Sequence, residues 1–88
     1  MTVFEAVKDR ADPADVLALY GLHPDKANMI SCPFHGKDEH PSMRVYKDGF
    51  YCFACGWHGD TIALAAQMDG ITPFEAAKKL NEALHLGV

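Results

Sequence analysis

Cys32-Pro33-Phe34-His35 and Cys52-Phe53-Ala54-Cys55 are two short segments, separated by sixteen residues, that each carry a pair of residues able to bind a metal. Two residues separate the members of each pair, and one tight turn at this spacing directs both donors at the same ion. Three thiolates and one imidazole form a complete tetrahedral ligand set for zinc, with no position left for a substrate. The sequence therefore predicts one structural Zn²⁺, bound by Cys32, His35, Cys52 and Cys55.

Two other histidines near these segments are rival ligands. His58 follows Cys55 closely, and His40 lies in the loop between the two pairs. We favour His35 because it forms a pair with Cys32, and we expect the two rivals to be exposed loop histidines. Three reduced, buried cysteines without a metal are a further alternative, since free cysteine is often buried and inert. Two ligand pairs in so short a chain argue against it.

Length and composition suit one small domain over residues 1–88, of a size that buries a modest core and is commonly supplemented by a metal. No apolar run approaches the ~20 residues of a membrane span. The chain does not open with the basic and apolar leader of a secretory signal. Three cysteines make a poor disulfide framework. Reduced thiolates on zinc favour the reducing cytoplasm.

The charge is unevenly distributed along the chain. The net charge of −4 argues against a general affinity for nucleic acids. Residues 1–27 and 59–88 contain more acidic than basic side chains, whereas residues 28–58 contain three of each together with three histidines. The central third is therefore the least acidic part.

Helices are predicted at both ends of the chain from their capping signals. Thr2-Val3-Phe4-Glu5 has the form of a capping box, for a helix that ends at about Arg10. Asp12 and Pro13 begin a second helix, which Gly21 ends. A third helix begins at Asp60 and ends at Gly70. A second capping box, Thr72-Pro73-Phe74-Glu75, begins a fourth helix that runs to about Leu84.

The centre of the chain predicts a small antiparallel sheet. Ala27 to Ser31 is expected to form one strand, and Ser42 to Tyr46 alternates as a second. Lys47-Asp48-Gly49 is expected to turn into a return strand from Phe50 to Phe53, with both phenylalanines in the core. We expect Gly56 to adopt a positive φ and Trp57 to shield the metal. The predicted class is α+β, a zinc ribbon flanked by about four short helices.

Four segments together carry a resemblance to a known family: Cys32-Pro33-Phe34-His35, Pro41-Ser42-Met43-Arg44-Val45, Phe50-Tyr51-Cys52-Phe53-Ala54-Cys55-Gly56 and Gly59-Asp60. They resemble the N-terminal zinc-binding domain of bacterial and phage DNA primases, whose ligand set is Cys-His-Cys-Cys. The resemblance extends from about Phe4 to Leu84. It implies that the chain binds single-stranded DNA template and helps a separate primase catalytic domain to start RNA primers.

The resemblance also implies that primer synthesis belongs to the downstream domain, so we expect no polymerase activity from these residues alone. The chain is either a free-standing module or part of a longer primase. Four protein ligands leave no open site for zinc-catalysed hydrolysis. An alternative function is a protein-interaction module that contacts a primase core or a replicative helicase, which the acidic flanks favour because they repel phosphate.

Single strands are bound by positive charge along the backbone and by aromatic faces that stack on bases. The candidate DNA-binding residues are Arg44, Tyr46, Lys47 and Tyr51 on the sheet, with Lys37 in the loop and His58 beyond the last cysteine. The charged candidates have an alternative role as solvated surface charges. The two tyrosines have an alternative role as partly buried sheet aromatics.

Overall fold

A computed structural model describes residues 3–34 and 41–87. In these residues the chain forms four helices and a four-stranded antiparallel sheet, which is the predicted α+β class. The elements in chain order are α1 (Val3–Arg10), α2 (Pro13–Leu19), β1 (Met29–Ile30), β2 (Met43–Tyr46), β3 (Gly49–Cys52), β4 (His58–Gly59), α3 (Thr61–Asp69) and α4 (Pro73–Ala83).

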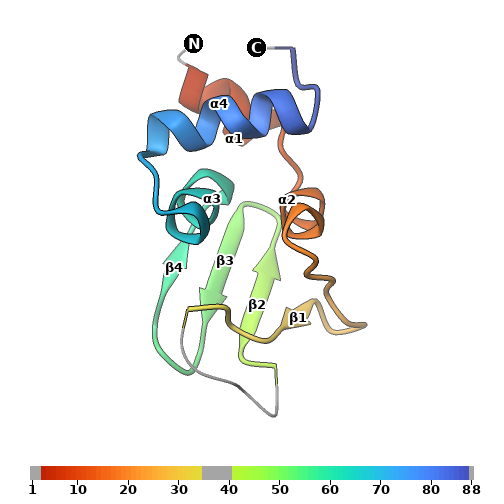
Figure 1. Cartoon of the computed structure of the whole chain (residues 1–88). Coiled ribbons are helices and arrows are strands. Elements are labelled where there is room, and N and C mark those ends of the chain that lie inside the picture. The colour runs from red at the N-terminus through yellow and green to blue at the C-terminus, as the bar shows by residue number, and fades with distance from the viewer. Residues whose placement is uncertain (1–2, 35–40, 88) are drawn as a thin grey trace.

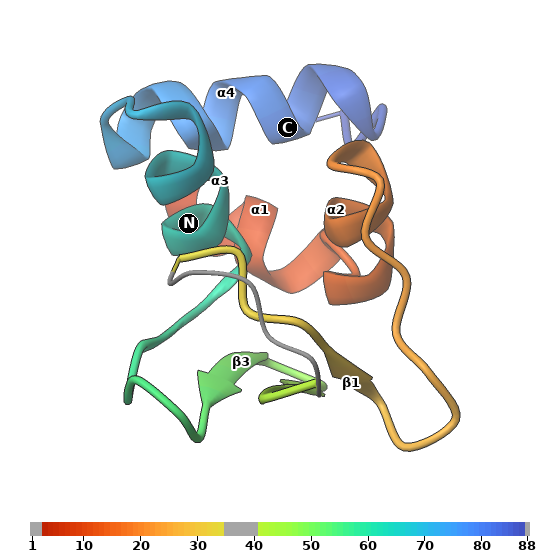
Figure 2. The same ribbon diagram turned by 60° about the horizontal axis from the view of Figure 1, so that its bottom comes forward.

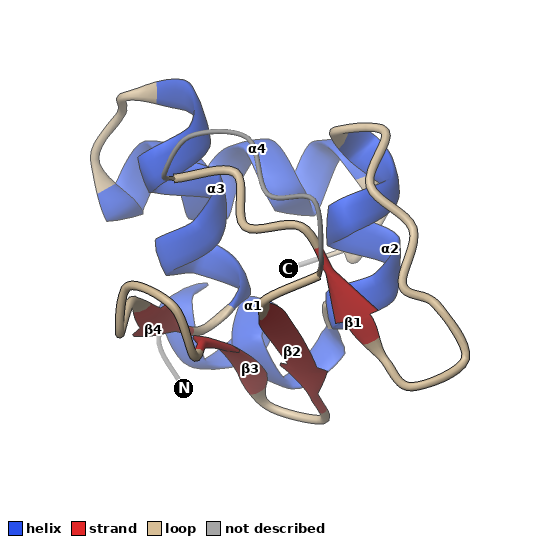
Figure 3. Cartoon of the chain, turned by 90° about the horizontal axis from the view of Figure 1, so that it is seen from below, coloured by secondary structure: helices blue, strands red, loops and turns tan. Residues whose placement is uncertain are grey.

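The helices form a layer over one face of the sheet (Figure 1). Helices α2 and α3 lie next to the sheet, and α4 lies on their far side (Figures 1 and 2). The strands lie side by side in the order β1-β2-β3-β4, and the other face of the sheet is not covered by a helix (Figure 3).

The helices begin where the capping signals predict. The side chain of Asp12 accepts a hydrogen bond from the backbone N–H of Ala14 at 2.9 Å, and that of Asp60 accepts one from Ala63 at 2.8 Å. Thr72 and Glu75 form a complete capping box, with both hydrogen bonds at 3.2 Å. Each of these bonds satisfies an N–H group that the first turn of a helix leaves unpaired. The predicted capping residue Thr2 lies outside the described residues.

Glycines end two of the helices, as predicted. Gly21 follows α2 with φ of +72°, and Gly70 caps α3 with φ of +64°. This left-handed conformation is costly for residues with a Cβ atom, and it directs the chain out of the helix.

The core lies between the helical layer and the inner face of the sheet. Two cross-strand rows contribute that face: Ile30, Met43 and Cys52 form one, and Val45, Phe50 and Gly59 form the other. The largest fully buried side chains are Leu17, Met43, Leu64, Leu80, Val7, Val16 and Cys52. The inner face thus carries a cysteine in the same row as its most deeply buried apolar side chain.

Strand β1 is shorter than the predicted strand from Ala27 to Ser31. Asn28 has a φ of +59°, which interrupts the extended conformation. The Asp25 side chain accepts hydrogen bonds from the backbone N–H groups of Ala27 and Met29, at 2.8 and 3.0 Å. A side chain that captures backbone donors in this way forms a turn in place of a strand.

The hairpin has a two-residue loop, Lys47-Asp48, and Gly49 is already the first residue of β3. Gly49 does not have a positive φ, so the turn is not the reason for glycine here. A Cβ atom at this position would lie 2.4 Å from the carbonyl oxygen of Gly59. Gly49 is therefore required because β4, a strand that the sequence did not predict, passes close to its backbone.

Gly49→Ala is expected to lower the free energy of unfolding by about 1–3 kcal/mol, because the added methyl group forces the backbone of β3 and β4 apart. Urea unfolding of the zinc-loaded protein measures this change. The matched control is Asp48→Ala, at the exposed neighbouring position, where we expect a change within about 0.5 kcal/mol. Equal destabilisation by both substitutions would contradict the close approach of β4.

Candidate metal centre and candidate nucleic-acid interface

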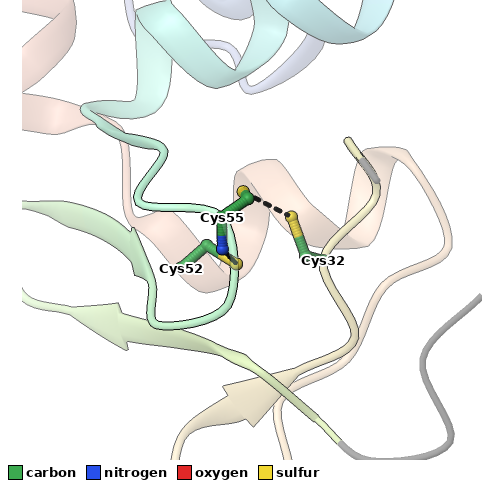
Figure 4. A group of neighbouring side chains, drawn as sticks. All are labelled: Cys32, Cys52 and Cys55. Carbon is green, nitrogen blue, oxygen red and sulfur yellow. Dashed lines mark hydrogen bonds between the residues drawn. The ribbon is translucent and has the colours of Figure 1, made fainter. Parts of the chain in front are cut away.

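Three cysteine side chains from different parts of the sheet converge at one end of it. Cys32 follows β1, Cys52 ends β3, and Cys55 lies in the turn that leads to β4. The three Sγ atoms all lie within 4.8 Å of one another, and those of Cys32 and Cys55 are 4.0 Å apart (Figure 4). None of the three forms a disulfide.

This arrangement fits a tetrahedral zinc ion. Zinc–sulfur distances of about 2.3 Å in a tetrahedron place two sulfurs about 3.8 Å apart, close to the separation of Cys32 and Cys55. Within residues 3–34 and 41–87, these cysteines are the only group of three or more His, Cys, Asp or Glu side chains with such spacing. The three thiols are therefore positioned to bind a metal, and His58 is not a member of their group.

The predicted fourth ligand, His35, lies outside the described residues, as do its rival His40 and the candidate DNA contact Lys37. The assignment of His35 therefore stays a prediction. Phe34, the last described residue before His35, has its ring in contact with that of Trp57, with centroids 4.6 Å apart.

The Cys32 thiol is strongly perturbed. Burial, together with smaller contributions from the sulfurs of Cys52 and Cys55, raises the pKa of Cys32 from 9.0 to about 12, against the lowering effect of a backbone N–H group at Phe34. A buried thiolate is unfavourable unless a cation compensates it. Without a metal the group keeps its proton at neutral pH, and a bound cation replaces that proton.

Backbone geometry supports the sulfur of Cys52. Its Sγ accepts a hydrogen bond from the N–H of Cys55 at 3.5 Å, and the Ser42 hydroxyl lies 3.6 Å away. Gly56 has the predicted positive φ, +78°, and its N–H donates to the carbonyl oxygen of Cys52 at 2.9 Å. The backbone N–H group that donates to the Cys52 sulfur is therefore that of Cys55. The N–H group of Gly56, the glycine that permits the turn, donates to a carbonyl oxygen instead.

The outer face of the sheet gathers most of the predicted DNA-binding residues. Arg44, Tyr51 and His58 are neighbours across β2, β3 and β4. Tyr46 lies on the same face, where the Arg44 guanidinium is 5.4 Å from its ring centroid. The rings of Tyr51 and His58 are nearly parallel, with centroids 6.0 Å apart. Lys47 is exposed in the hairpin loop, where it lines a hollow together with Lys8 and Pro13 of the helical layer, so it is not a member of this face.

Phe53 also belongs to this outer face, and the prediction that it is buried is wrong. Phe50 is buried as predicted, but Phe53 is 62% exposed and its ring lies 5.2 Å from that of Tyr51. Side chains alternate between the faces of a strand, so residues three apart cannot share a face. The signal was present in the sequence: if Cys52 points inward to the metal, its neighbours Tyr51 and Phe53 must point outward.

Tyr46 and Tyr51 are both exposed, which argues against the alternative that they are partly buried aromatic residues of the sheet. Tyr46 is 45% exposed and Tyr51 is 39% exposed. The outer face, defined here as Arg44, Tyr46, Tyr51, Phe53 and His58, therefore presents three exposed aromatic rings, an imidazole and a guanidinium to solvent.

Among the described residues, no helix is long and apolar enough to cross a membrane.

Comparison with known proteins places this geometry in a family. Residues 1–88 match the family model described as CHC2 zinc finger. A DNA primase of Listeria monocytogenes is 34% identical over 90 residues, which cover 98% of this chain and 14% of the relative. The Gene 58 protein of Mycobacterium phage D29 is 42% identical over 62 residues, which cover 68% of this chain and 46% of that protein.

A solved structure shows the same fold. The crystal structure of the Aquifex aeolicus primase, with its zinc-binding and RNA polymerase domains, matches with a TM-score of 0.80 and 32% identity, over 94% of this chain and 21% of that one. The chain thus spans about a seventh of the primases it matches, 14% in the Listeria relatives. The predicted resemblance is confirmed, and the chain belongs to the CHC2 zinc-finger family, the zinc-binding domain of DNA primases.

Proposed function

We propose that this chain is the template-binding zinc module of a DNA primase, which holds single-stranded DNA on the outer face of its sheet and assists a separate catalytic domain in starting RNA primers. The observation that carries the proposal is the alignment of Arg44, Tyr51 and His58 across three strands, flanked by Tyr46 and Phe53. Stacking platforms and positive charge are the two features that unspecific binding of single strands requires.

The metal has a structural role in this proposal. Zn²⁺ would be held by Cys32, Cys52 and Cys55, with His35 as the fourth ligand. It would cross-link these parts of the chain and catalyse no reaction, because four protein ligands leave no coordination position open for a substrate. The three thiols join the end of β1 to the end of β3 and to the following turn. They thereby hold the strands that present the outer face. Reduced thiols in this role suit the cytoplasm.

The charge on the outer face is small, and this sets the expected affinity. Among the described residues, Arg44 is the basic side chain of the outer face, and Lys47 in the hairpin loop and Lys37 are further candidates. A few phosphate contacts give weak and salt-sensitive binding. Attachment to a catalytic domain raises the effective concentration of template at the module, so weak intrinsic binding is sufficient for its role.

A second candidate function is docking to a primase core or a replicative helicase. The observation that favours it is the acidic helical layer, where Glu5, Asp9, Asp15, Glu75 and Glu82 are all exposed. Such a surface repels a phosphate backbone and complements a basic protein surface. The two functions use opposite sides of the molecule, so substitutions distinguish them.

Substitutions on the outer face are expected to weaken binding of a labelled single-stranded oligonucleotide, measured by fluorescence anisotropy at low and at raised salt. Phe53→Ala and Tyr51→Ala each lose a stacking surface, which is worth about 1–3 kcal/mol, or roughly a 5-fold to 150-fold loss of affinity. Arg44→Ala is expected to reduce the slope of log affinity against log salt by about 0.7, the value for one phosphate contact on a single strand.

The matched controls lie on the helical layer. Phe74 is an exposed aromatic residue of α4, and Lys78 lies over its ring. Phe74→Ala and Lys78→Ala should leave DNA binding unchanged. If they weaken it as much as Phe53→Ala and Arg44→Ala do, the outer face is not the site. If no variant and no salt condition gives DNA binding while a purified primase core or helicase binds the chain, docking is the function.

His35→Ala is expected to reduce zinc affinity by roughly a hundredfold, because one of four ligands accounts for about a quarter of the ~10 kcal/mol that structural zinc supplies. The melting temperature should fall with it, since zinc binding is coupled to folding. His58→Ala is the control and should change neither quantity. Zinc content by mass spectrometry and thermal melting test both variants, and the reverse outcome would assign the fourth ligand to His58.

Zinc affinity should rise with pH from neutral to well above pH 9. The folded pKa of Cys32, about 12, lies above its ordinary value of 9.0. The protonated thiol therefore stabilises the metal-free fold below pH 9, and this stabilisation is lost as the pH rises towards 12. Zinc must displace that proton, so binding strengthens as the proton becomes easier to remove. Competition with a chelator at several pH values measures this, and a plateau near pH 9 would contradict the raised pKa.

A further inference from the structure

The three cysteines differ sharply in their access to solvent. Cys52 is 0% exposed and Cys32 is 4% exposed, whereas Cys55 is exposed in its turn. Oxidation of a thiol by a dissolved oxidant follows its exposure. Cys55 is therefore the residue of the three that a peroxide in solution reaches most readily.

The geometry also selects the thiol that reacts next. The sulfurs of Cys55 and Cys32 point toward one another at a separation of 4.0 Å (Figure 4). A disulfide requires about 2.05 Å, so the two sulfurs must approach by about 2 Å. Cys55 sits in an exposed turn beside Gly56, which has φ of +78°, whereas Cys32 and Cys52 are buried.

Cys52 is held more firmly than Cys55. It pairs with Met43 in the sheet, and its N–H donates to the carbonyl oxygen of Trp57 at 2.8 Å. Its sulfur accepts the N–H of Cys55 and lies near the Ser42 hydroxyl. Movement of this sulfur toward either partner would disturb the ladder of β3 and these contacts.

We propose that Cys55 is a peroxide-sensitive site whose oxidation product is a Cys32–Cys55 disulfide, with Cys52 left reduced. The thiolate of Cys55 attacks the peroxide O–O bond, which forms a sulfenic acid and releases one water after protonation. The Cys32 sulfur then attacks the Cys55 sulfur, which forms the S–S bond and releases the hydroxyl group as a second water. The two thiols together lose two electrons and two protons, and the peroxide is reduced to two waters.

The Cys32–Cys55 disulfide would replace the metal centre as the cross-link between these segments. It joins the end of β1 to the turn between β3 and β4, which are the segments that the metal centre joins. It also removes two sulfurs from the ligand set, so the metal is released while the chain keeps a tether between the same segments. A thiol reductant reverses the reaction. The inference concerns the metal centre and does not depend on the proposed DNA binding.

The test treats the zinc-loaded full chain with hydrogen peroxide, alkylates the remaining thiols and maps the links by mass spectrometry. Trypsin leaves Cys52 and Cys55 in one peptide, because no lysine or arginine lies between them. Chymotrypsin cleaves after Phe53 and separates them. We expect the Cys32–Cys55 link to exceed each other link by roughly tenfold, with alkylated Cys52 and one equivalent of zinc released per disulfide.

Two variants test the order of the steps. In Cys32→Ser the sulfenic acid has lost its partner, and dimedone should label Cys55 in preference to Cys52. In Cys52→Ser the Cys32–Cys55 link should still form. The proposal is overturned if the wild-type chain forms mainly Cys52–Cys55 or Cys32–Cys52, or if Cys55 stays unmodified in peroxide that fully oxidises glutathione. The wild-type mapping is decisive even if a variant does not fold.

Discussion

Three sulfurs from two segments of the chain must occupy one small volume, and the rest of the structure depends on this constraint. The strands on either side are short: β1 and β4 have two residues each, and β2 and β3 have four. Ladders of this length are marginal in isolation. A cation that binds the three thiols would join β1, β3 and the following turn, and it would compensate the Cys32 thiolate that burial otherwise disfavours. The sheet and the metal centre are therefore one structural unit.

The same constraint determines which side chains face solvent. Because Cys52 must point inward, the alternation of the strand directs Tyr51 and Phe53 outward. The cross-strand register then brings Arg44 and His58 beside Tyr51 on the same face. The positions of the aromatic rings on the outer face thus follow from the position of a ligand on the inner face. Under the proposed function, this coupling would let a structural metal determine the arrangement of the surface that binds DNA.

The parts of the fold that depend on local chemistry were predictable from the sequence. Asp12, Asp60 and the Thr72–Glu75 capping box begin helices where their side chains satisfy nearby N–H groups. The parts that depend on distant contacts were not predictable. Strand β4 has only two residues and no alternating pattern of its own, since it exists through pairing with β3. Gly49 is explained by the backbone of Gly59, ten residues away, and no local rule for turns contains that information.

The fold places most of the acidic side chains in one layer, and this changes how the net charge of the chain bears on DNA binding. A net charge of −4 argues against binding to DNA if the charge is spread evenly. In the folded chain the exposed carboxylates of α1, α2 and α4 lie in the helical layer (Figure 1). Arg44 lies on the outer face of the sheet, beside Tyr51 and over the ring of Tyr46. Under the proposed function, a polyanion would be repelled from the helical layer and would meet aromatic rings with a guanidinium on the outer face, so the acidic layer would restrict the orientation in which a single strand approaches. An acidic composition is therefore compatible with the proposed binding of nucleic acid, because the fold separates the acidic layer from the outer face.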